Sequence, residues 1–146
     1  MPSAACCDTS FLFSLYGHDA HTPRAITLVR QLASPITITV LNDYELSQAA
    51  QFAVFRQLLS PANAKAILAA FEADTSSGRL VRESCNLAEV VTEAKHLSLL
   101  HTPSGGHCSF DILHVAAAVR LKAAIFLTFD SRQRALAQVA GLKPIH

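Results

Sequence analysis

Short apolar runs alternate with longer segments of helical periodicity, and this alternation restricts the possible folds more than any other feature of the chain. The runs ITITV (36–40) and AAIFLTF (123–129) are rich in β-branched and aromatic residues, which predicts strands. Weaker strand candidates are SAACC (3–7) and RLVRE (79–83). Apolar residues recur at helical spacing within 25–32, 64–71, 87–94 and 112–119, and the segments 43–58 and 131–140 are expected to be helices with weaker periodicity. Strands that alternate with helices favour a parallel sheet covered on both faces, so we expect a three-layer α/β/α fold.

The length of the chain predicts a single domain over 1–146. It has 146 residues, of which 51% are hydrophobic, and this is enough to bury one sizeable core. The connections look short, with Gly, Pro and Ser in HTPSGGHCS (101–109) and in the closing AGLKPI (140–145). The N-terminus lacks a signal-peptide pattern, and no apolar run approaches the ~18 residues of a membrane span. We therefore expect a soluble cytoplasmic protein.

Charge and cysteine content leave several functions open. The formal net charge of +1 neither favours nor excludes a nucleic-acid partner. The four cysteines show no C-x-x-C spacing, so we expect reduced thiols, with Cys6 and Cys7 on opposite faces of a strand. His101, His107 and Cys108 suggest zinc, but a fourth ligand at motif spacing is missing.

Some acidic residues differ from the solvated acids on the polar faces of helices, because each lies where a helix is expected to begin. These residues are Asp8, Glu45, Asp111 and Asp130. Each has a local alternative, in which it only caps its helix or complements the helix dipole. In a parallel sheet, however, the carboxyl ends of all strands lie at one edge, where the following helices begin. Asp8, Glu45 and Asp130 follow strands and should converge there, whereas Asp111 follows a loop and is less constrained by the pattern.

Crowded carboxylates repel one another and raise one another's pKa unless a cation compensates their charge. Their hard oxygen ligands suit Mg²⁺ or Mn²⁺ better than zinc. We therefore expect the four carboxyl groups to lie within roughly 10 Å of a common centre that binds one or two ions.

The segments around these acids resemble the four segments that carry the acidic residues of the PIN-domain family. The matching segments are CCDTSFLFSLY, ITVLNDYELSQA, FDILHVAAAVRL and FLTFDSRQRALAQVAGL, in order along almost the whole chain. They look most similar to the VapC-like toxin ribonucleases of bacterial toxin–antitoxin pairs. The resemblance implies a metal-dependent endoribonuclease in which Asp8, Glu45, Asp111 and Asp130 hold Mg²⁺ or Mn²⁺. It also implies a homodimer with a groove for a small antitoxin protein.

Other residues of these segments have candidate roles. The hydroxyls of Ser10 and Thr128 are placed to hydrogen-bond the metal-binding carboxylates or their waters, and ordinary turn chemistry is the alternative. Relatives of this kind carry an arginine three residues before the third acid, where this chain has Cys108. The candidates for contacts with RNA phosphates are Arg120, Arg132 and Arg134, with a solvated surface as the alternative.

His114 lies one turn after Asp111 on a helix face that is otherwise apolar. A catalytic role is one interpretation, and packing with a satisfied hydrogen bond is the interpretation we favour.

Two rival functions come from other classes. A phosphatase resembling haloacid dehalogenases needs a second aspartate two residues after the first, where this chain has Ser10. A non-catalytic PIN-fold binding or scaffold protein is compatible with the small net charge and with Cys108. We favour the enzyme, because four carboxylates at one edge cost stability when no metal compensates them.

Phenylalanines are too numerous in two segments to face a single core. They are Phe11, Phe13, Phe52 and Phe55. A small domain would expose part of this surface if it were alone, so we expect these helices to form the homodimer interface.

Overall fold

Five parallel strands form one sheet in the computed structural model, which describes residues 4–146; Ser3 of the predicted run SAACC lies outside the described residues. The strands are β1 (Ala5–Cys7), β2 (Ile36–Ile38), β3 (Leu80–Arg82), β4 (Ile125–Leu127) and β5 (Lys143–Ile145). Their order in the sheet is β3-β2-β1-β4-β5, and all neighbours are parallel. The carboxyl ends of β1, β2 and β4 therefore lie side by side at the centre of one edge.

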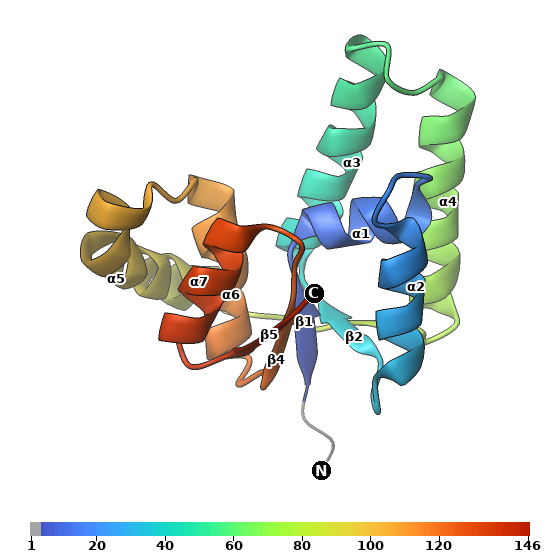
Figure 1. Ribbon diagram of the computed structural model, residues 1–146. Helices are drawn as coiled ribbons and strands as arrows, with labels where there is room; N and C mark the ends of the chain where they lie inside the picture. The colour runs from blue at the N-terminus through green and yellow to red at the C-terminus, as the bar shows by residue number, and fades with distance from the viewer. Residues whose placement is uncertain (1–3) are drawn as a thin grey trace.

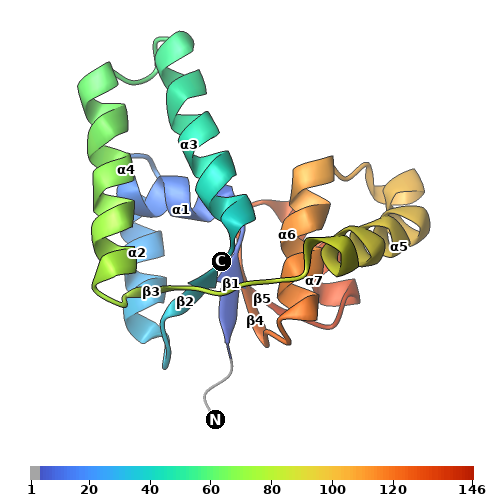
Figure 2. The same cartoon turned by 180° about the vertical axis from the view of Figure 1, so that it is seen from behind.

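Helices cover both faces of this sheet, which confirms the predicted three-layer α/β/α fold (Figures 1 and 2). One face is covered by α1 (Thr9–Tyr16), α2 (Thr22–Gln31), α3 (Val40–Phe55) and α4 (Pro61–Ser76). The other is covered by α5 (Leu87–Gly105), α6 (Ser109–Arg120) and α7 (Ser131–Val139).

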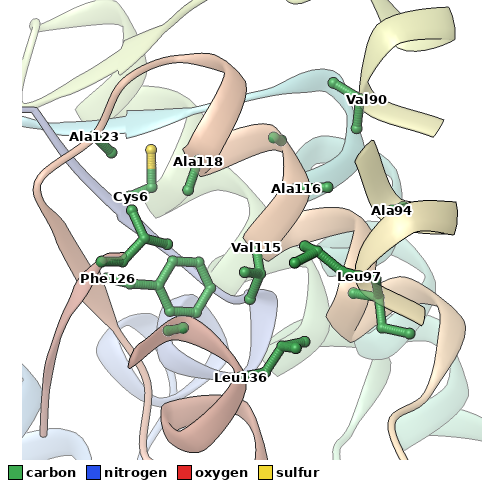
Figure 3. Close-up of a cluster of buried hydrophobic side chains, with 14 residues drawn as sticks. Cys6, Val90, Ala94, Leu97, Val115, Ala116, Ala118, Ala123, Phe126 and Leu136 are labelled. Atoms are coloured by element: carbon green, nitrogen blue, oxygen red, sulfur yellow. The ribbon is translucent and has the colours of Figure 1, made fainter. Parts of the chain in front are cut away.

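The core is divided by the sheet into two clusters, because successive side chains of a strand point to opposite faces. Cys6 and Phe126 pack with α5, α6 and α7, where Phe126 lies against Val115 and Leu136 (Figure 3). Cys7 packs on the other face, against side chains of α1 to α4. The prediction for the adjacent cysteines is confirmed, and all four thiols are free.

Two connections differ from the sequence-based expectation. The closing segment, expected to be a loop, contains β5, which pairs with β4 at the edge of the sheet. Pro144 is tolerated there because an edge strand leaves one side of its backbone unpaired. The segment 101–105, also expected to be a loop, is the last turn of α5. The helix ends at Gly105, and the next residue, Gly106, has a φ of 65°, which is easily adopted only by a residue without a side chain.

The hairpin of α3 and α4 extends beyond the rest of the molecule (Figure 1). Phe11 is buried, whereas Phe52 and Phe55 are 51% and 79% exposed and stack with their ring centroids 5.8 Å apart. The expectation that these phenylalanines do not all enter the core is confirmed. Within residues 4–146, no helix is both long and apolar enough to cross a bilayer.

Candidate active site

The acidic site is built where strands end and helices begin. Asp8 directly follows β1 and is the N-cap of α1, and Asp130 is the N-cap of α7 shortly after β4. Glu45 lies in the second turn of α3, and Asp111 in the first turn of α6. The pairing of Cys7 with Leu127 places the residues after β1 and β4 next to each other.

Three hydrogen bonds hold Asp8 in a buried position, where only 2% of its surface is exposed. Its carboxylate accepts hydrogen bonds from the Phe11 amide at 2.8 Å, the Ser10 hydroxyl at 2.8 Å and the Thr128 hydroxyl at 2.7 Å. Burial raises the pKa of Asp8, and these three hydrogen bonds partly oppose that rise. The expected contacts of Ser10 and Thr128 with a site carboxylate are therefore present.

Asp111 shows that the four acids share one region of the protein. Burial raises the pKa of its half-buried carboxyl group to about 6, with further contributions from the charges of Asp8, Asp130 and Glu45. In the part of the chain that the structure describes, this carboxylate accepts no hydrogen bond. The backbone of Asp111 is linked to the start of α7, because the side chain of Gln133 donates a hydrogen bond to the Asp111 carbonyl at 3.0 Å. The Gln133 amide donates to Asp130 at 2.9 Å, which is the N-cap bond of α7.

Glu45 contacts a buried histidine. Its Oε1 lies 2.9 Å from Nε2 of His114, a ring that is itself 3% exposed. Burial disfavours the ionised form of Glu45, but the contacts with His114 and Thr9 outweigh it, so the pKa of Glu45 is lowered overall. The favoured interpretation of His114, packing with a satisfied hydrogen bond, is right about its burial, but its partner is one of the four acids.

Two of the four acids are helix N-caps, and the other two lie inside their helices. Asp8 and Asp130 cap their helices through side-chain oxygens. In α3, Thr39 is the N-cap, and Asn42 completes the capping box from the third helical position. In α6, Cys108 occupies the N-cap position, and its side chain makes no capping bond.

The candidate phosphate-binding arginines are spread over two places. Arg120 ends α6 and pairs with Glu89 at 2.6 Å, nine residues along the helix from Asp111, or roughly 13 Å. The structure does not bring it to the acids. Arg132 and Arg134 lie in the first turn of α7 beside Asp130. Arg132 is exposed and lines a cleft with His101 and His107.

Within residues 4–146, no lysine or arginine forms an ion pair with any of the four acids. Nor do three His, Cys, Asp or Glu side chains there form a closed metal-ligand set, at the acids or around His101, His107 and Cys108. The carboxyl group of Asp111 thus interacts electrostatically with the other three acids, and none of the four has a lysine or arginine partner among residues 4–146. Carboxylate oxygens are the type of donor that hard divalent cations prefer.

An open cleft of about 620 Å³ begins beside the acids and continues along α3. Thr9, Ser10 and Glu45 line its end near the site, and Phe52 and Arg56 line its other end. Phe52, one member of the exposed phenylalanine pair, therefore lines the same cleft as Glu45.

The PIN-domain family model matches residues 5–139. This chain belongs to the PIN-domain family. The match spans all four acids, and the resemblance drawn from the sequence motifs is confirmed. No curated protein sequence matches this PIN domain.

Solved structures confirm the fold of this PIN-domain chain. VapBC-1 from nontypeable Haemophilus influenzae superposes with a TM-score of 0.68 at 15% identity, over 97% of this chain and 96% of that one. VapBC2 from Rickettsia felis, bound to a DNA fragment from its promoter, gives 0.65 at 14% identity over 97% of both chains. FitAcB from Neisseria gonorrhoeae gives 0.63 at 12% identity, over 97% and 96%.

Sequence reasoning missed the tertiary contacts that several buried polar residues make at the site. Gln133, Asn42 and Thr9 are buried and touch the site, yet each lies in an ordinary helical pattern. The available signal was a polar side chain on an otherwise apolar helix face, which His114 also shows.

Proposed function

We propose that this protein is an endoribonuclease that hydrolyses RNA phosphodiester bonds with Mg²⁺ or Mn²⁺, and that it is the toxin of a type II toxin–antitoxin pair. The observation that carries the proposal is the electrostatic interaction of Asp111 with Asp8, Glu45 and Asp130, without a lysine or arginine partner for any of them among residues 4–146. Partly buried negative charge of this kind favours a bound divalent cation.

The four acids are the residues that would hold the ion. When bound, the ion lowers the pKa of a coordinated water and neutralises charge that develops on the phosphate. Ser10 and Thr128 orient the carboxylate of Asp8 and favour its ionised form through their hydrogen bonds. Gln133 ties the backbone of Asp111 to the helix that Asp130 caps, which keeps these two acids together.

Two arginines that lie near the acids are the proposed contacts for phosphates of the RNA substrate. Arg132 and Arg134 stand in the first turn of α7, where phosphates of an RNA strand at the acids pass nearby. Arg120 is a poorer candidate, because its guanidinium already pairs with Glu89 at the other end of α6.

The toxin assignment is supported by the fold and by the surface. Three structural neighbours are VapBC or FitAcB assemblies, which supports an antitoxin protein as a partner here. The exposed Phe52 and Phe55 offer apolar surface for a homodimer or for an antitoxin helix next to the cleft. A cytoplasmic location accords with such a role.

A non-catalytic PIN-fold binding protein is the second candidate. The observation that favours it is Cys108, which occupies the place of the expected arginine and is exposed without a capping bond. Metal binding without RNA cleavage would identify this function.

Incubation of the purified protein with labelled single-stranded RNA tests the two candidates. We expect cleavage with Mg²⁺ or Mn²⁺, its loss with chelator, and a decrease of orders of magnitude in Asp8→Asn and Asp111→Asn variants that remain folded. Glu93→Gln, which neutralises an acid on α5, serves as the control and should cleave like the wild type. Undiminished cleavage in either site variant would exclude the metal-dependent mechanism.

A further inference from the structure

The ring of His114 bridges two residues that lie three positions apart on α3. Its Nε2 is 2.9 Å from Oε1 of Glu45, and its Nδ1 is 3.5 Å from Nδ2 of Asn42. Residues three apart share one face of a helix, so a single ring reaches both. Thr9 joins the cluster, with its Oγ1 3.0 Å from the same Nε2.

Backbone geometry determines which nitrogen of His114 carries the proton. The Thr39 amide donates to Oδ1 of Asn42 at 3.0 Å within the capping box of α3. Since a backbone amide can only donate, Oδ1 of Asn42 faces Thr39 and its Nδ2 faces the histidine. Nδ1 of His114 is therefore the acceptor, and the proton on Nε2 is donated to Glu45.

Packing alone does not account for a histidine at this position. The residues that follow it on α6, from Val115 to Ala118, are buried and apolar, and a leucine would fill the site without polar atoms. A buried imidazole costs stability unless both nitrogens have partners. The partners of His114 all belong to the acidic site or to the start of α3. The cavity beside the ring measures about 10 Å³, which leaves little room for a water in their place.

We infer that His114 is a positioning residue: its Nε2–H holds the carboxylate of Glu45 in the orientation needed to bind the divalent ion, and Asn42 sets the ring tautomer for this task. This inference rests on the proposed function, because it assumes that Glu45 is a metal ligand. Partners of this kind fix the direction of a ligand's free oxygen, and their loss typically weakens metal binding 10–100-fold.

Metal affinity measured without RNA tests the inference. We expect His114→Leu to raise the Kd for Mn²⁺, measured by electron paramagnetic resonance of the free ion, by about 10–100-fold. His114→Gln keeps an N–H near the position of Nε2 and should recover most of the affinity. His96→Leu on α5 controls for the loss of a histidine and should bind as the wild type does. Equal losses in the Leu and Gln variants, with both folded by circular dichroism, would show a packing role and overturn the inference.

A double-mutant cycle separates a positioning role from a structural one. In a Glu45→Gln background, His114→Leu should weaken Mn²⁺ binding little further, because its effect passes through Glu45. An equal loss in both backgrounds contradicts the inference and leaves the metal site intact. If Glu45→Gln alone leaves Mn²⁺ affinity unchanged, Glu45 is not a ligand, and the proposed metal site is wrong in this respect too. Tight Mn²⁺ binding without RNA cleavage contradicts only the proposed nuclease function.

Discussion

The hydroxyl of Thr128 donates a hydrogen bond of 2.7 Å to the carboxylate of Asp8, 120 residues earlier in the chain. The two residues directly follow β4 and β1, which are neighbouring parallel strands. The same hydroxyl accepts a hydrogen bond of 3.1 Å from the backbone amide of Asp130. One threonine thus joins the first and last acids of the site.

Thr128→Val keeps the shape of the side chain and removes this hydrogen bond. We expect the free energy of unfolding at pH 7 to fall by about 1.5–3 kcal/mol, since the buried Asp8 carboxylate loses a charge-assisted bond. Urea denaturation measures the change. Thr128→Ser retains the hydroxyl and should lose much less, and equal losses in both variants would point to the missing methyl group instead.

The contribution of Asp111 to the stability of the metal-free protein should fall as the pH rises from about 4 to 6. Burial, together with the charges of Asp8, Asp130 and Glu45, raises the pKa of Asp111 from 3.8 to about 6. In this window the folded protein retains a proton that the unfolded chain has released, so a rise in pH favours unfolding. Asp111→Asn removes the titration. Its free energy of unfolding should therefore increase relative to the wild type across the same window, and a constant difference between the two proteins would contradict the assignment.

Asp130→Asn separates capping from metal binding. Asparagine caps a helix about as well as aspartate, so the variant should keep the N-cap bond to Gln133 and remain folded. It should lose much of its stabilisation by Mn²⁺. For the wild type, a free Mn²⁺ concentration of 100 times the Kd should raise the free energy of unfolding by about 2.7 kcal/mol. A scanning fluorimetry titration measures both, and an unchanged Mn²⁺ shift would remove Asp130 from the ligands.

Arg132 and Arg120 should differ in their effect on RNA binding. Arg132→Ala is expected to weaken binding and to reduce the slope of log K against log salt by about 1, because one phosphate contact is lost. Arg120→Ala should change neither, because Arg120 pairs with Glu89 away from the acids. Fluorescence anisotropy at several salt concentrations, with Ca²⁺ in place of Mg²⁺, gives both values. The reverse result would move the RNA path to the other end of α6.

The exposed phenylalanines of α3 provide the test of the homodimer. Phe55→Glu places a charge in apolar surface that is 79% exposed, and should convert a dimer to a monomer of about 16 kDa without unfolding it. Light scattering at micromolar concentration reports the mass. Leu99→Glu, at a position on α5 that is 71% exposed, is the control. Dissociation by that variant alone would place the interface on α5, and a wild-type monomer would exclude the dimer.

Local patterns were enough to predict the architecture and to single out the four acids as candidates. Strand and helix periodicities depend on neighbours a few residues apart, and so does the preference of acids for helix starts. The convergence of Asp8 with Asp130 followed from a general property of parallel sheets. β5 was missed because Pro144 argues against a strand unless the strand is known to lie at an edge.

Only the tertiary structure decided which side chains meet. Asp111 joins the other acids because α6 begins at the carboxyl edge of the sheet, which a loop in the sequence does not reveal. His114 and Glu45 are 69 residues apart, and Arg120 and Glu89 are 31 apart. Such pairs depend on the order of strands and the packing of helices across the whole domain. Short-range patterns in the sequence carry no information about them.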